Sequence, residues 1–198
     1  MIDAFTIAAH QTELTARWHQ STPVASGTGL SLLIEENHLR NFAIWHEEDI
    51  ARRDDLGFEA IYHAKRNIDR FNQERNNFAE EIDKAIVADL QPAESGCPRN
   101  SETPGMMIDR LSILALKETH MQEETGRPGA STAHREKCVE KLARIRRQRD
   151  DLTTCLAELL DDVVARRRTF SVYFQFKMYN DPSLNPQLYR QASSSKES

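Results

Sequence analysis

The chain has little of what marks secreted or membrane proteins. It contains 3 cysteines in 198 residues, and Cys97, Cys138 and Cys155 show neither CxxC nor Cys/His spacing. An odd number of unclustered cysteines is typical of a reduced intracellular protein. No run approaches the roughly 20 apolar residues of a membrane span, and the first residues lack a signal-peptide pattern. We therefore expect a cytoplasmic protein with no membrane span.

Glycine and proline are also scarce, at 7 residues each, whereas charged residues make up 29% and hydrophobic residues 39% of the chain. This balance is typical of a helical globular protein. The formal net charge is -5, and the arginine-rich stretches 144–147 and 166–168 have acidic neighbours. Because the chain lacks an overall basic field, we expect no nucleic-acid partner.

Hydrophobic periodicity predicts an all-α, single-domain helical bundle of about five helices. The expected helices cover residues 3–19, 29–53, 56–90, 104–124 and 132–164. After them, Phe170, Val172, Phe174 and Phe176 alternate with polar residues. That alternation predicts an extended C-terminal aromatic arm, with a paired strand or a short helix as alternatives. We expect one domain over residues 1–190 and a disordered tail over 191–198.

The most informative pattern is charge on the core-facing sides of the predicted helices. On the second helix, the apolar arc centred near Phe42 also holds Glu35, His38, His46, Asp49 and Arg53. The third helix repeats this with Lys65, Asp69, Asn72, Arg75, Asn76 and Asp83, and later helices add Asp109, His120 and Arg149. Burying an ionised group is costly unless it is paired. The pattern therefore predicts either a buried ion-pair network or a polar cleft between helices.

For the cleft we expect a ligand that is an anionic small molecule, such as a phosphorylated or nucleotide-linked sugar. The candidate catalytic residues are His46, Asp49 and Asp109, with His46 and Asp49 as an acid/base pair one turn apart. The candidate substrate-binding residues are Trp45, Arg53, Lys65, Asp69, Asn72, Arg75, Asn76, His120 and Lys177. Arginine and lysine are the groups that bind phosphate and carboxylate. The pattern identifies no cofactor and does not decide whether the protein is an enzyme.

Two other functions remain open. One is a non-catalytic interaction or scaffold module, in which the arm and the heptad-like seam over 138–163 form a homodimer. The other is a metal-binding bundle of the ferritin-like type, for which Glu35 and His38 supply one Glu-x-x-His pair. Basic Lys65 and Arg75 share the face of the remaining carboxylates and oppose a cation, so we assign no metal ligands.

Four ordered motifs resemble a known family. They are NFAIWHEEDIAR at 41–52, KRNIDRFNQERNNFAEEID at 65–83, ETPGMMIDRLSILALKETHM at 102–121 and QFKMYNDPSLNP at 175–186. Together they resemble the bacterial family catalogued as domain of unknown function 4254, over residues 35–190. The resemblance implies a mainly helical bacterial protein, and some relatives lie near genes for lipopolysaccharide or other cell-surface sugars. No reaction is assigned to the family, so the resemblance implies no catalytic residues.

Overall fold

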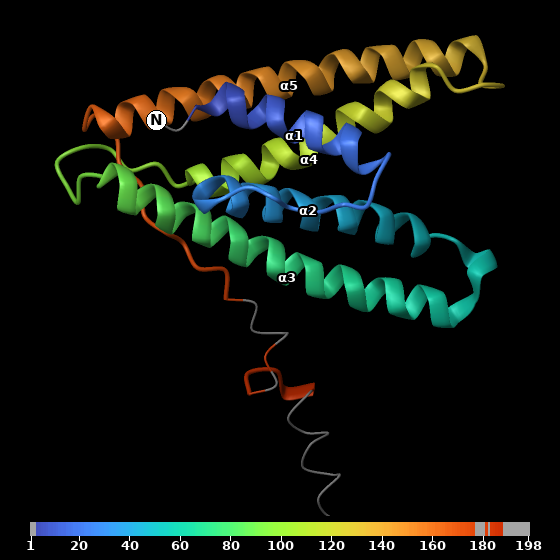
Figure 1. The fold of residues 1–198 in the computed structure, drawn as a ribbon, viewed down its shortest axis with the longest axis horizontal. Coiled ribbons are helices and arrows are strands. Elements are labelled where there is room, and N and C mark those ends of the chain that lie inside the picture. Colours follow the sequence, from blue (N-terminus) through green and yellow to red (C-terminus); the bar gives the residue numbers. More distant parts are fainter. Residues whose placement is uncertain (1–2, 177–180, 182, 188–198) are drawn as a thin grey trace, which may run out of the picture.

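The computed structural model describes residues 3–176, 181 and 183–187. Throughout these residues it confirms the all-α bundle (Figure 1). The elements are α1 Ala4–Trp18, α2 Gly29–Ile50, the single 3-10 turn η1 Asp54–Leu56, α3 Gly57–Leu90, α4 Pro104–Thr125 and α5 Thr132–Val164. None of these helices is long and apolar enough to cross a membrane.

The bundle is organised around α4, which contacts α1, α2, α3 and α5. Helices α2 and α3 form one antiparallel hairpin, α4 and α5 form a second, and α1 lies across both (Figure 1). The main core contains Ile82, Ile86, Ile108, Leu111, Leu156 and Leu159. A smaller cluster of Leu14, Trp18, Phe42 and Leu116 continues it toward the other end of α2. Because α4 is enclosed on several sides, its sequence is apolar nearly all round.

Local capping explains where the helices begin. The Asp3 side chain accepts hydrogen bonds from the amides of Phe5 and Thr6 at the start of α1. Thr103 accepts from the Met106 amide, with Pro104 at the first position of α4, and Ser131 accepts from the His134 amide at the start of α5. The backbone amides of a first helical turn have no hydrogen-bond partner within the helix, and these side chains supply one.

The structure departs from the sequence-based expectation at the end of the second helix. Helix α2 ends at Ile50 instead of continuing to 53, so that Arg53 caps η1. Residues 171–176 form neither a helix nor a strand, which agrees with the expected extended arm, and an isolated parallel bridge joins Arg99 to Thr169. Phe170 is buried, but Phe174 is 51% and Phe176 83% exposed, so the alternating pattern does not reflect a buried face. The expected tail at 191–198 lies outside the described residues.

The heptad-like seam of α5 packs inside the chain. Its buried members are Cys138, Leu142, Leu152, Leu156, Leu159 and Val163. Helix α5 packs against α4 and α1, which accounts for this burial. The apolar side chains of the seam are therefore covered by α4 and α1 of the same chain. They are not exposed on α5 for the homodimer that their spacing suggested.

Candidate functional site

A cavity of about 380 Å³ opens between α2, α3 and α4. It is lined by Asn41, Ile44, Trp45, Glu48, Asp49, Arg52, Arg75, Ile113 and Leu116. Residues 41, 45 and 48 recur every three or four positions and so follow one side of α2, and Arg52 lies in the turn that comes after this helix. We call this cavity the cleft; it lies between the three helices where the sequence predicts one.

Arg75 gives the cleft its most distinctive chemistry. Its guanidinium contacts Asn41 Oδ1 and Asn76 Oδ1, each at 3.5 Å, and its Nε lies 3.6 Å from Asp109 Oδ1. All three distances exceed the usual 2.7–3.2 Å of such hydrogen bonds. Among the described residues, the buried Nε atom has no hydrogen-bond partner. The guanidinium is held in place but retains donor capacity for an additional oxygen ligand.

Asp109 lies next to Arg75 but does not itself line the cleft. Its Oδ1 accepts hydrogen bonds from Asn37 Nδ2 at 3.0 Å and from Asn41 Nδ2 at 2.9 Å. Asn37 also donates to the backbone carbonyl of Arg75 at 3.1 Å. These contacts join α2, α3 and α4 at one point. Asp109, predicted as catalytic, therefore connects α2 to α4 beside Arg75 through its hydrogen bonds.

His38, also on α2, is fully buried. Its ring nitrogens contact Ser112 Oγ at 2.7 Å and Thr15 Oγ1 at 3.0 Å, and its ring stacks on Trp18 with centroids 5.1 Å apart. Burial lowers the pKa of His38 to about 3, so the ring is neutral at pH 7. With both nitrogens occupied, His38 is unsuited to the ferritin-like metal site.

Trp45 forms an aromatic wall of the cleft. Its indole stacks almost parallel on the His120 ring, with centroids 4.5 Å apart and an angle of 4° between the planes. His120 Nδ1 contacts Glu123 Oε2 at 3.1 Å, while its buried Nε2 has no partner in the described part of the chain. The stacking fixes the orientation of the Trp45 ring.

Charges of both signs surround the mouth of the cleft. Arg52 pairs with Glu48 at 2.6 Å, and both groups line the cavity. Asp49 is exposed, and within the described residues its side chain makes no hydrogen bond or ion pair. Arg52 and Glu48 were absent from the predicted site, although they follow Trp45 at helical spacing and could have been found from it.

His46 lies beside the cleft and does not line it. Its ring packs edge-on against Phe42 at 4.5 Å, His19 at 5.4 Å and His120 at 6.0 Å. Burial lowers the pKa of His46, the charges of His19 and His120 lower it further, and Asp49 opposes them. Within the described residues these three histidines do not bring their nitrogens together as metal ligands do. The predicted His46–Asp49 pair is thus divided between an aromatic cluster and the cleft wall.

Several predicted binding residues lie away from the cleft. Arg53 is exposed and pairs with Asp55 at 2.6 Å. Lys65, 63% exposed at its side chain, pairs with Asp69 at 3.0 Å. Asn72 is half-buried and Asn76 is buried behind Arg75, while Lys177 lies outside the described residues. The structure therefore assembles Trp45, Asp49 and Arg75 around the cavity, with His120, Asn76 and Asp109 supporting them.

Two other inner carboxylates act as structural anchors. Glu35 Oε2 accepts from the amides of Ser26 and Gly27 at 2.7 and 3.0 Å, and Oε1 lies 2.8 Å from His10 Nε2. Burial raises the pKa of Glu35, but these hydrogen bonds outweigh it and hold the pKa below its ordinary value. Asp83 accepts from Thr103 Oγ1 and the Gly105 amide, and burial raises its pKa to about 6.

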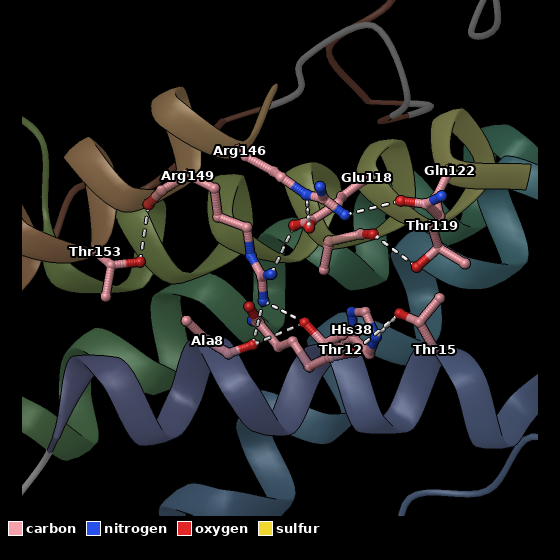
Figure 2. Close-up of polar contacts among 12 residues, drawn as sticks. Ala8, Thr12, Thr15, His38, Glu118, Thr119, Gln122, Arg146, Arg149 and Thr153 are labelled. Atoms are coloured by element: carbon pink, nitrogen blue, oxygen red, sulfur yellow. Dashed lines mark hydrogen bonds and ion pairs between the residues drawn. The ribbon is translucent and has the colours of Figure 1, made fainter. Parts of the chain in front are cut away.

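Arg149 belongs to a separate lattice on the far side of α4. Figure 2 shows its side chain reaching from α5 toward α1, where it donates to the Ala8 carbonyl and to Thr12 Oγ1. It also pairs with Glu118 at 2.9 Å, and Arg146 binds the other oxygen of that carboxylate at 2.9 Å. Burial raises the pKa of Glu118, yet the two arginines bring it below its ordinary value. This network joins three helices and has the character of the predicted ion-pair lattice.

A larger cavity, of about 650 Å³, lies between α1, α2 and the end of α3. Its polar lining includes Asp3, Glu13 and Asp89, and among the described residues that line it His10, already paired with Glu35, is the one basic group. A wall rich in carboxylates repels anions. Of these two cavities, the smaller cleft at Arg75 is therefore the better candidate for binding an anion.

Comparison with known proteins identifies the family. Residues 31–172 match the model of a family described as protein of unknown function, DUF4254. No curated protein and no solved structure matches the chain. The matched span covers α2 from residue 31 onward and all of α3, α4 and α5, and it therefore includes every residue that lines the cleft. The chain belongs to the DUF4254 family of proteins of unknown function.

Proposed function

We propose that the cleft binds an anionic small molecule through Arg75. The observation that carries this proposal is a guanidinium in the cavity wall whose three side-chain contacts are all 3.5 Å or longer. Arginine presents a planar fork of N–H donors that matches two oxygens of a phosphate or carboxylate. An anion in the cleft would give Arg75 the short, charge-assisted hydrogen bonds that the protein does not supply.

The other lining groups favour a sugar as the body of this ligand. The Trp45 ring, immobilised against His120, offers a flat apolar surface for the carbon–hydrogen face of a pyranose. Asp49 carries carboxylate oxygens without an ion-pair partner in the described residues and can accept hydrogen bonds from hydroxyl groups. A phosphorylated or nucleotide-linked sugar meets both requirements. The resemblance to a family with members near genes for cell-surface sugars supports the same class of ligand.

If the bound sugar undergoes a reaction, Asp49 is the group that we assign to proton transfer. It lines the cavity, whereas His46 lies behind it in the aromatic cluster. A general base must come within hydrogen-bond distance of the proton that it removes. His46, neutral at pH 7 because burial lowers its pKa, contributes to the packing of the wall.

A thermal-shift panel tests this proposal. The panel contains sugar phosphates, nucleotide sugars, inorganic phosphate and uncharged sugars, each tested against wild type, Arg75→Ala and Arg66→Ala. Arg66 is the matched control because it lies on the same helix, is 66% exposed and does not line the cleft. A ligand at 100 times its Kd stabilises a protein by about 2.7 kcal/mol, which is a readily measured shift in Tm.

We expect a sugar phosphate to raise the Tm of wild type and Arg66→Ala but not that of Arg75→Ala. Inorganic phosphate should give a smaller shift because it makes no contact with Trp45. A panel in which no anionic sugar shifts the Tm contradicts the proposal. An equal shift in wild type and Arg75→Ala also contradicts it.

A non-catalytic homodimer is the second candidate, favoured by apolar side chains exposed where η1 leads into α3. Phe58 is 94%, Tyr62 61% and Leu56 41% exposed. Phe58 and Tyr62 are four residues apart and share one helix face. Exposed apolar patches of this kind mark protein interfaces. Analytical ultracentrifugation tests this candidate: it requires a wild-type dimer that Phe58→Ser converts to a monomer, and a monomeric wild type excludes it.

A further inference from the structure

Three different metal-ligating side chains meet at the turn between α4 and α5. Glu124 lies in the last turn of α4, and His134 and Cys138 lie in the first turns of α5. His134 Nε2 is 3.0 Å from Glu124 Oε2 and 3.4 Å from Cys138 Sγ. The three ligand atoms all lie within 4.8 Å of one another. None of these residues lines the cleft, so the cluster is independent of the proposed anion site.

From this geometry we propose that the cluster binds a zinc ion. Zinc takes thiolate, imidazole and carboxylate ligands at about 2.0–2.3 Å in a tetrahedron, which places neighbouring ligand atoms about 3.4–3.6 Å apart. The two observed separations are within half an ångström of that range. The mixture of a sulfur, a nitrogen and an oxygen ligand favours zinc over calcium or magnesium, which require oxygen ligands.

Charge and local structure also support the assignment. A thiolate and a carboxylate together neutralise a divalent ion, so that the complete site carries no net charge. His134 and Cys138 are one helical turn apart and therefore lie on one face. The Ser131 hydroxyl accepts from the His134 amide, which fixes the start of α5 and hence the position of both side chains. Cys138 is 4% exposed, so its sulfur is protected from bulk solvent.

The site has three protein ligands and leaves the fourth position of the tetrahedron to water. His134 and Glu124 are about 40% exposed at their side chains, which allows water to reach the ion. Zinc here joins the end of α4 to the beginning of α5 and stabilises the hairpin that they form. Because the thiol must lose its proton to bind, we expect affinity to fall as the pH is lowered.

One neighbouring group competes with the ion. The Arg127 guanidinium, 53% exposed, lies 3.4 Å from Glu124 Oε2. It must turn into solvent when that oxygen binds zinc, and an exposed ion pair of this kind contributes about 0.2–1 kcal/mol. Arg127→Ala should therefore tighten zinc binding by up to about fivefold. Weaker binding in Arg127→Ala would contradict the assignment of Glu124 as a ligand.

Cobalt(II) is the probe for the decisive experiment because a thiolate bound to it gives a strong charge-transfer band in the near ultraviolet. The full-length protein is freed of metal with a chelator and titrated with cobalt chloride, and zinc is then added to displace the cobalt. The variants are Cys138→Ser and His134→Ala, with circular dichroism to verify their helical content. Cys155→Ser is the matched control, since Cys155 lies on the same helix and is exposed.

We expect a band that saturates at one cobalt per chain in wild type and Cys155→Ser and that zinc abolishes. The band should be absent from Cys138→Ser, and His134→Ala should lower the affinity by more than about 100-fold. Absence of the band from wild type overturns the proposal. Retention of the band in Cys138→Ser, or its loss in Cys155→Ser, overturns it as well.

Discussion

The Asn41 side chain donates a hydrogen bond to Asp109 Oδ1 at 2.9 Å and so joins α2 to α4 next to the Arg75 side chain. The same carboxylate oxygen lies 3.6 Å from Arg75 Nε. Asp109 therefore lies beside Arg75 but leaves the Nε–H donor of the guanidinium without a short hydrogen bond. This relationship distinguishes the cleft from the Arg149 network, where Glu118 and Thr12 contact the guanidinium at 2.9 and 2.5 Å.

Replacing Asp109 with Ala should destabilise the fold. The change leaves the amide groups of Asn37 and Asn41 without their shared acceptor, and an unsatisfied buried donor costs about 1–3 kcal/mol. Urea denaturation should show that the free energy of unfolding falls by an amount in this range or above it. Asp69→Ala is the control, because its exposed pair with Lys65 contributes less than about 1 kcal/mol. Equal losses in the two variants would contradict the role of Asp109.

His38 should make the fold sensitive to acid. Its pKa is about 3 in the folded protein, below the ordinary value of 6.5, because burial disfavours the charged ring. The unfolded state therefore binds more protons between pH 6.5 and 3. The contribution of His38 to stability is complete above pH 6.5 and is lost as the pH falls, by at most about 1.4 kcal/mol per unit.

Urea denaturation from pH 4 to 7 measures this effect as the difference between wild type and His38→Gln. Wild-type stability relative to the variant should fall as the pH falls through this range. A difference that is independent of pH would mean that His38 takes up a proton in the folded protein as readily as in the unfolded chain, which contradicts the lowered pKa.

Asp83 should give the opposite dependence of stability on pH. Burial raises its pKa to about 6 from the ordinary 3.8, so the folded state binds the extra proton between these values. Its contribution to stability is complete below pH 3.8 and is lost as the pH rises through 6. Relative to Asp83→Asn, wild type should lose stability between pH 4 and 6 in urea titrations. A relative gain over that interval would show that the carboxylate is charged when buried.

Gly105→Ala should disrupt the contact between α3 and α4. A Cβ at position 105 would lie 2.2 Å from the Ala79 carbonyl oxygen and 2.9 Å from the Asp83 carboxylate. Backbone must move to relieve such a clash, at a cost of about 1–3 kcal/mol or more. Gly126→Ala is the control, with its nearest contact at 3.8 Å. Thermal denaturation should lower the Tm of Gly105→Ala well below that of Gly126→Ala, and similar Tm values would refute the close approach.

Helical periodicity predicted the buried polar groups well where α4 covers the hairpin of α2 and α3. Glu35, His38 and Asp83 are all 3% exposed or less. It predicted that Arg53 and Lys65 face inward, but both are exposed because they lie at or near the turn that joins α2 to α3, where residues 52–59 are all exposed. A helical wheel gives the direction in which a side chain points from its helix. It does not show whether another helix packs against that position along the helix axis.

The sequence did not predict the proposed zinc cluster, for a different reason. His134 and Cys138 have helical i,i+4 spacing, but a mixed pair of histidine and cysteine matches neither the CxxC nor the His-x-x-x-His pattern typical of zinc sites. Glu124 reaches them because the turn after α4 folds back, and the sequence specifies a turn there without specifying its geometry. In the C-terminal arm, alternation predicted an extended chain but did not reveal that Phe174 and Phe176 lack a surface to cover them.

The central claim is that an anionic sugar binds at Arg75 beside Trp45, and Trp45 fluorescence tests it most directly. Wild type, Arg75→Lys and Trp45→Phe are each titrated with a hexose 1-phosphate. Wild type should show a saturable change in emission, and Arg75→Lys should bind at least about tenfold more weakly, since the bidentate fork is lost. Trp45→Phe should show no change. No saturable change in wild type, or the same titration curve in Arg75→Lys, would contradict the account.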